Sequence, residues 1–306
     1  MSRLPRSIAS AGLAMAAAAL AGLALGSCAA PLRLRGGADP LAILEPGLAA
    51  YARLEGGLAR GLAAKALPAE EAASLAPLLE RTRVLALGLG RTAAGGASPA
   101  SNGRLVEAAL LGDYPFRRAS LGLAASREWR REGGAYLHEA SGLRALVPGP
   151  ALALASTGPL EPLLARARDP GSSPIPPRLA PLAEAELLVW IPAPFSFAAL
   201  GELELGSLPA RGLLVAARPA GEGRLEATVA LLMEDADSAR LYRPAVRLAW
   251  YFLAPAILGG EAELPGPGFE LEGDLIYARG LTLPESALAG LFRLALPEGL
   301  PGPAPR

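Results

Sequence analysis

Reactive side chains are scarce in this sequence, which holds one cysteine, Cys28, and one histidine, His138. A single cysteine excludes an intramolecular disulfide and any metal site that is built from several thiolates. Lysines and arginines number 29, only Lys65 being a lysine, and 29 aspartates and glutamates balance them to a net charge of +0. This balance leaves no basic surface of the kind that binds nucleic acid, so we expect no nucleic-acid partner.

Catalytic motifs are also missing. The Gly-x-Ser-x-Gly elbow of many hydrolases does not occur, and a zinc helix motif needs a second histidine. Gly88-Leu89-Gly90 follows a predicted strand, but the chain continues with glycine, serine and proline instead of the helix that a phosphate site requires. We therefore expect no catalytic residue, no cofactor and no metal. A hydrolase that uses His138, next to Glu139, stays as an alternative if the fold brings a nucleophile and an orienting acid to it.

The amino terminus has the pattern of a secretory signal. Arg3 and Arg6 provide positive charge, and residues 11–25 are apolar or glycine. This stretch is shorter than the ~20 residues that a membrane-spanning helix needs. It ends at Leu25-Gly26-Ser27-Cys28, where the only thiol of the chain follows two small residues.

These four residues resemble the lipobox of bacterial lipoproteins, in which an aliphatic residue and two small residues precede the cysteine. The resemblance covers residues 3–28. It implies cleavage between Ser27 and Cys28 and a diacylglyceryl group on the Cys28 thiol, often with acylation of the new amino group. It also implies a location in the cell envelope, at the outer membrane or the periplasmic face of the inner membrane, with the covalent lipid as the link to the membrane.

Apolar spacing predicts the elements at the start of the mature chain. Asp39-Pro40 is a typical helix start, and leucines spaced by three and four predict an amphipathic helix over 44–62, interrupted by Pro46 and Gly56-Gly57. A second helix over 68–81, a buried strand over 84–89 and a loop over 90–103 follow.

Two later stretches resemble each other and suggest an internal duplication. Residues 103–113 align with 223–235, each a predicted strand that runs into an acidic residue and then an arginine-containing helical stretch. Residues 149–167 similarly parallel 273–291, each read as a strand, a turn and a helix that begins at proline. Hairpin signals favour antiparallel pairing. The sequence therefore predicts an α+β fold, mainly antiparallel sheet with packed helices, as two tandem β-β-α-β-β-α-like repeats after a helical segment.

The expected organisation runs as follows along the chain: signal peptide 1–27, tether 28–38, helical segment 39–82, first repeat 83–168, proline-rich linker 169–185, second repeat 186–296 and disordered tail 297–306.

Three aromatic residues are candidates for a contact surface: Trp129, Trp250 and Tyr251. Trp129 lies among arginines and is expected to be exposed, whereas Trp250 and Tyr251 lie in the most apolar stretch of the mature chain, where most positions should be core. The acidic residues 234–238 could bind calcium, but helix capping explains them better.

The expected function is that of an exported, lipid-anchored envelope protein with a non-enzymatic binding or structural role. The alternatives are the hydrolase and a carrier of an apolar ligand, which would lie between the two halves against helices 44–62 and 239–258.

Overall fold

The computed structural model describes residues 39–66, 76–91, 104–115, 124, 129–139, 142–194, 209–221, 223–258 and 268–285. The chain forms two compact units, Met1–Pro174 and Ile175–Arg306. The boundary falls inside the predicted linker 169–185. Cys28, Ser27, the signal peptide, the tether and the tail 297–306 lie outside the described residues.

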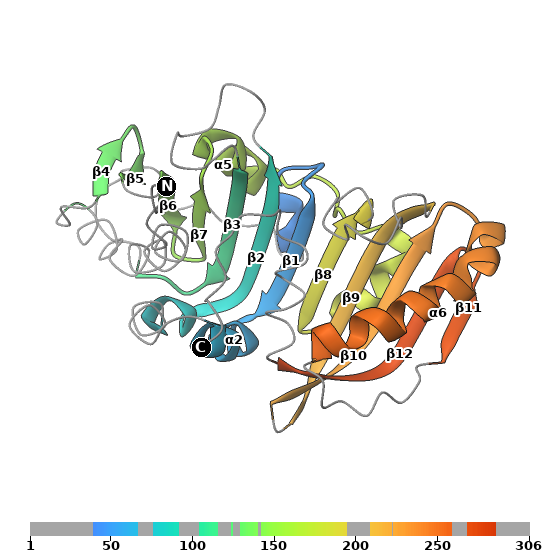
Figure 1. The fold of residues 1–306 in the computed structure, drawn as a ribbon. Coiled ribbons are helices and arrows are strands. Elements are labelled where there is room, and N and C mark those ends of the chain that lie inside the picture. The colour runs from blue at the N-terminus through green and yellow to red at the C-terminus, as the bar shows by residue number, and fades with distance from the viewer. Residues whose placement is uncertain are drawn as a thin grey trace, which may run out of the picture. The chain divides into compact units, whose positions relative to one another are not determined.

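Unit 1 is built on an antiparallel sheet (Figure 1). Its strands follow the spatial order β1-β2-β3-β7-β6-β5-β4, and the printed pairings along this order are all antiparallel. The strands are β1 (Ala50–Glu55), β2 (Thr82–Arg91), β3 (Arg104–Gly112), β4 (Trp129–Glu132), β5 (Ala135–His138), β6 (Leu143–Gly149) and β7 (Leu152–Ser156).

Three helical elements accompany this sheet: η1 (Pro40–Ile43), α2 (Gly56–Ala66) and α5 (Leu160–Arg168). Every residue of β7 is buried, and α5 packs on that strand through Leu160, Leu163 and Ala167. Burial alternates along β6, as expected for a strand with one face on the core. The apolar core of unit 1 therefore lies between the sheet and the elements η1 and α5.

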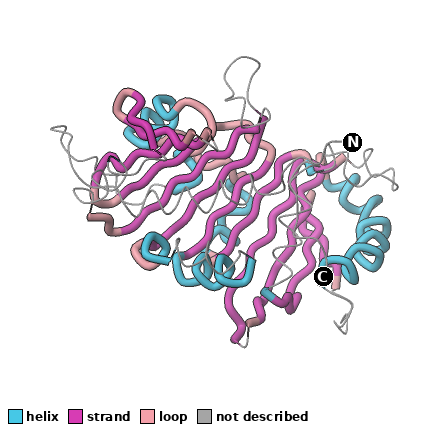
Figure 2. Tube along the Cα trace, turned by 60° about the vertical axis from the view of Figure 1, so that its left-hand side comes forward, coloured by secondary structure: helices cyan, strands magenta, loops and turns pink. Residues whose placement is uncertain are grey.

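Unit 2 also has antiparallel strands, in the order β8-β9-β10-β12-β11. Its elements are η3 (Pro177–Glu184), β8 (Leu187–Pro192), β9 (Ala210–Gly221), β10 (Arg224–Met233), α6 (Ala236–Leu258), β11 (Phe269–Glu272) and β12 (Leu275–Pro284). The helix α6 lies along one face of β10, β12 and β11, whereas η3 packs on β9. Figure 2 shows the strands of each unit running side by side.

This architecture confirms the α+β class and the mainly antiparallel sheet. Asp39 also caps η1 as expected, since its carboxylate accepts a hydrogen bond from the Leu41 N–H at 3.0 Å. The strand over 84–89 exists and is longer than expected, from Thr82 to Arg91.

The predicted helix over 44–62 is wrong. Residues 50–55 form β1, which pairs with Val84–Leu89 of β2, and a helix starts only at Gly56. The leucine spacing was misleading because β1 is buried on both faces, with Ala50 and Ala52 among the buried residues, so no period of two is visible. Gly56 and Gly57 begin α2 instead of interrupting a helix. A Cβ at Gly56 would lie 1.8 Å from the Thr82 carbonyl oxygen, so only glycine fits there.

Three smaller expectations also need correction. Part of the predicted linker is the helix η3, and its Leu179 is fully buried. The predicted turn within 273–291 is a continuation of β12 to Pro284, through Gly280 at a φ of +68°. The helical stretch predicted after Asp113 extended to Trp129, which instead begins β4. Of the predicted helix over 68–81, residues 76–81 lie within the described residues, and 76–79 are helical.

Candidate functional site

A side-chain cap precedes the helix α6. The Asp235 carboxylate accepts a hydrogen bond from the Ser238 N–H at 2.7 Å, three residues further on. The hydrogen bonds from Ser238 hold the pKa of Asp235 below its ordinary value. Capping therefore accounts for Asp235. Among the residues that the structure describes, no group of three or more His, Cys, Asp or Glu side chains could hold a metal ion.

The inner face of α6 fixes the helix to the sheet of unit 2. Ala239 is fully buried, and Tyr242 and Val246 pack beside it at helical spacing. Their partners are Leu231 and Met233 of β10, Ile276 of β12, and Phe269 and Leu271 of β11. One stripe of apolar side chains thus supplies the contact that a surface helix needs.

The outer face of α6 carries a second set of large apolar side chains. Leu241 is 72% exposed, Leu248 58% and Tyr251 40%, and these are the exposed large hydrophobic residues of the described part of the chain. Their spacing of seven and three residues aligns them along one side of the helix. Single exposed leucines are common, whereas an aligned set on one helix is a candidate contact surface. We call Leu241, Leu248 and Tyr251 the outer stripe.

A row of arginines runs beside the outer stripe. Arg240, Arg243 and Arg247 are all exposed and recur at spacings of three and four. Arg240 pairs with Asp237 at 2.9 Å, and the Arg247 guanidinium lies 5.9 Å from the centre of the Tyr251 ring. Asp237 is the only acidic residue of α6, so the helix has an excess of positive charge beside its exposed apolar stripe.

The predicted contact residues differ in their placement. Tyr251 belongs to the outer stripe and Trp250, next to it, is partly buried. Trp129 is only 8% exposed, contrary to expectation, because the β4–β5 pairing places it opposite His138 and the two rings lie 5.0 Å apart. Leu241 and Leu248 were not singled out from the sequence. A helical projection of 236–251 with the inner positions removed would have found them.

The structure buries His138. Its residue exposure is 1%, and its ring packs on Trp129. A catalytic histidine has to reach a substrate proton directly or through one water molecule. Its burial therefore argues against the hydrolase alternative.

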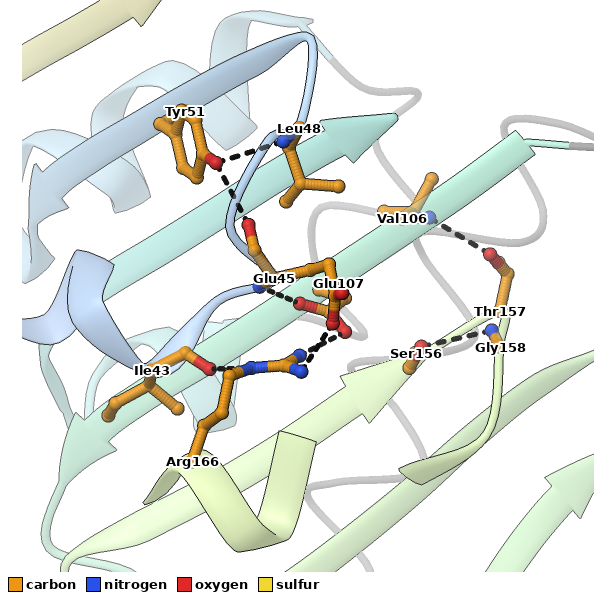
Figure 3. A network of polar contacts seen from close by, with 10 residues as sticks. All are labelled: Ile43, Glu45, Leu48, Tyr51, Val106, Glu107, Ser156, Thr157, Gly158 and Arg166. Carbon is orange, nitrogen blue, oxygen red and sulfur yellow. Dashed lines mark hydrogen bonds and ion pairs between the residues drawn. The ribbon is translucent and has the colours of Figure 1, made fainter. Parts of the chain in front are cut away.

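Unit 1 contains a buried cluster of charged groups that the sequence did not indicate (Figure 3). Glu107 on β3 is 2% exposed. Its carboxylate accepts hydrogen bonds from the Glu45 N–H at 2.6 Å and from Arg166 at 2.7 Å. Arg166 on α5 also pairs with the Glu45 carboxylate and donates to the Ile43 carbonyl at 2.9 Å. Burial raises the pKa of Glu107, although the hydrogen bond from Glu45 and the positive charge of Arg166 act to lower it.

The cluster reaches β1 through a hydroxyl group. Tyr51 donates to the Glu45 carbonyl at 2.8 Å and accepts from the Leu48 N–H at 2.9 Å. Burial raises the pKa of Tyr51. The segment between η1 and β1 is therefore bound to β3 and α5 by polar contacts as well as by the buried side chains of Leu44 and Leu48.

The described helices include none that is both long enough and apolar enough to cross a membrane. In the described residues, the fold and surface together define an α+β protein with antiparallel strand pairing and a helix, α6, whose outer side is apolar and basic.

Comparison with known proteins gives fold relatives only. No family model and no curated protein matches the chain. The structure is similar to crystal form III of TP0453, with 18% identity, a TM-score of 0.60, and coverage of 86% of this chain and 100% of that chain. Crystal form I of TP0453 gives 19% identity and a TM-score of 0.60 at the same coverage. Likeness at this level of identity concerns the fold alone.

Proposed function

We propose that this chain is a lipid-anchored envelope protein with a non-enzymatic role, and that α6 is its contact surface for an anionic membrane. The outer stripe carries the proposal, because it is an exposed apolar surface beside a row of arginines on one helix. The apolar run that ends at Ser27-Cys28 supports it independently, since it resembles a lipoprotein signal.

Charge favours lipid over a second copy of the chain as the occupant of this surface. Two α6 helices packed face to face would bring Arg240, Arg243 and Arg247 of one copy close to those of the other, and like charges repel. Anionic headgroups attract such arginines while leucine and tyrosine enter the acyl boundary. The exposed side chains thus have the two properties that an interfacial helix combines.

Vesicle binding tests this role with the mature chain carrying Cys28→Ser, so that no acyl chain contributes. The chain should bind phosphatidylcholine vesicles that contain phosphatidylglycerol more tightly than pure phosphatidylcholine, and added salt should weaken the binding. Leu241→Ser with Leu248→Ser should reduce the affinity about tenfold or more, because burial of each leucine contributes about 1.5–3 kcal/mol when complete.

Ala245→Ser is the matched control, since position 245 is also exposed on α6. It introduces serine into the same helix without removing a large apolar side chain, and its vesicle affinity should equal that of the parent chain. Equal affinity of the parent and the double leucine variant, or no binding by the parent, would count against a membrane role and favour a protein partner.

An apolar ligand carrier is the second candidate from the sequence. One of its two predicted walls, the helix over 44–62, is not formed, because 50–55 is strand β1. No other observation favours this role over the membrane contact.

We also infer that the two units descend from one duplicated unit. Strand order supports this: β1-β2-β3-β7-β6 in unit 1 corresponds to β8-β9-β10-β12-β11 in unit 2. The correspondence retains the alignment of 103–113 with 223–235, and it matches β8 to β1 and β9 to β2. Relatives with this strand order and with more similar copies would support the duplication, whereas relatives with only one of the units in several lineages would oppose it.

A further inference from the structure

The Glu107 cluster of unit 1 holds two carboxylates and one guanidinium. Arg166 bridges Glu107 and Glu45, and the side chains are 3% exposed for Glu107, 19% for Arg166 and 42% for Glu45. With both acids ionised, the cluster has one negative charge in excess. Glu107 is the carboxylate that is removed from water, and keeping it ionised is costly because it shares the guanidinium of Arg166 with a second acid.

In the described part of the chain, Arg166 is the cation that contacts Glu107. The charged or titratable groups identified around it are Glu45 from the segment before β1, Tyr51 from β1 and Arg166 from α5. The neighbouring strands place Gly88 of β2 and Ser156 of β7 opposite Glu107, and neither carries a charge. Protonation of Glu107 is therefore the simplest means of neutralising the excess negative charge of the cluster.

We propose that the cluster is a proton-operated latch: as the pH falls, Glu107 takes up a proton, Arg166 keeps Glu45 as its counterion, and residues 40–48 are held more firmly on the sheet. The latch operates whether or not Cys28 carries lipid. The segment that it holds is the first described part of the chain after the predicted tether 28–38, so the latch regulates the end of the body nearest to the proposed anchor.

The direction of the effect follows from the pKa of Glu107. Burial raises this pKa in the folded state, so the stability that the protonated form contributes is fully present below the unfolded value of about 4.3. That contribution is lost as the pH rises through the pKa that Glu107 has in the folded state. A salt bridge that lowers the pKa of a carboxylate has the opposite effect, because its stabilisation is lost as the pH falls. The direction of the pH dependence therefore distinguishes the two cases.

Hydrogen exchange of the 40–48 segment tests the latch in the mature chain between about pH 4.5 and pH 8, corrected for the intrinsic exchange rates. The opening equilibrium constant of the segment should rise by roughly threefold or more toward pH 8. In Glu107→Gln, whose side chain is neutral at every pH, the opening equilibrium constant should not change with pH. A rise of the same size in this variant, or a fall toward pH 8 in the parent, would overturn the proposal.

Glu45→Gln provides a second variant in case Glu107→Gln does not fold. Glu45 is partly exposed, and its loss leaves Glu107 and Arg166 as a balanced pair. The pH dependence of the segment should then shrink, and an unchanged dependence would contradict a shared guanidinium. Asp39→Asn is the matched control, because Asp39 caps η1 without touching the cluster. It should keep the parental pH dependence, and losing that dependence would assign the effect to the cap.

Discussion

At the scale of single residues, close packing leaves no room for a side chain at Gly212 on β9. A Cβ there would lie 1.8 Å from Cη2 of Trp190, which is 4% exposed on the neighbouring strand β8. Gly212→Ala should therefore lower the free energy of unfolding by about 1–3 kcal/mol, the usual effect of overpacking. Urea denaturation measures this change.

Two further variants separate the clash from a general effect of alanine. Gly171→Ala should be nearly neutral, since nothing lies within 4 Å of its Cβ position and it is exposed. In a Trp190→Leu background, Gly212→Ala should be less harmful than in the parent. An equal loss in both backgrounds would mean that the ring is not the obstacle.

Tyr114 gives the second prediction at this scale. The Thr82 hydroxyl donates to the Leu78 carbonyl at 2.9 Å, so the Tyr114 hydroxyl, 2.9 Å from Thr82, is the donor of that pair. Burial raises the pKa of Tyr114 to about 12. The pKa of tyrosine in an unfolded chain is about 10. The stability that protonated Tyr114 contributes is therefore fully present below this pKa and is lost as the pH rises toward 12. The loss amounts to at most about 3 kcal/mol of unfolding free energy.

Tyr114→Phe removes this titration. The difference in unfolding free energy between the parent and Tyr114→Phe should therefore narrow between about pH 9 and pH 11.5, measured in guanidinium chloride. A gap that stays constant across this range would mean that another group dominates the alkaline response.

At the scale of elements, the cap of α6 sets the third prediction. Asp235→Ala should lower protection from hydrogen exchange in the first turn of α6, because the Ser238 N–H loses its acceptor. Asp235→Asn keeps an acceptor oxygen and should retain most of the protection. The pKa of Asp235 is lowered in the folded state. The stability that the cap contributes is therefore fully present above the ordinary pKa of an aspartate and is lost as the pH falls through the pKa of Asp235 in the folded state. Equal protection in all three chains would exclude a role for the cap.

Helices and strands could be predicted from the sequence where one face of the element is buried and the other is exposed to solvent. The strand over 224–233, its acidic end and α6 followed from such a pattern, as did the helix α5. The strand β7, in which every residue is buried, followed instead from its resemblance to residues 273–291. The strand β1 could not be recognised, because both its faces are buried and its alanines hide the alternation.

The candidate sites depend on tertiary contacts that no local pattern contains. Glu107 lies in an apolar strand and meets Arg166 across 59 residues of sequence. The outer stripe was hidden for a different reason: the apolar residues of α6 exceed what its inner face can use, and only the packing of Ala239, Tyr242 and Val246 separates the two sets. Trp129 was judged exposed from its arginine neighbours, whereas strand pairing buries it against His138.

At the scale of the whole molecule, two attachments to the membrane would act together. Acyl chains contribute ~0.8 kcal/mol per buried methylene and give lasting but non-directional anchoring when two or more are present. In the proposed role, the outer stripe of α6 would add a weaker contact that determines which side of unit 2 faces the lipid. Loss of the stripe should therefore leave the protein membrane-bound, whereas loss of the thiol should remove the anchor.

Metabolic labelling of the full-length chain in a host with the lipoprotein pathway checks this last prediction. The parent and Leu241→Ser/Leu248→Ser should both incorporate labelled fatty acid and enter the detergent phase. Cys28→Ser should incorporate none and accumulate as the uncleaved precursor, because the thioether has no other thiol on which to form. Normal cleavage of Cys28→Ser, with the product in the detergent phase, would show that the apolar segment is an ordinary signal and that membrane attachment lies elsewhere in the chain.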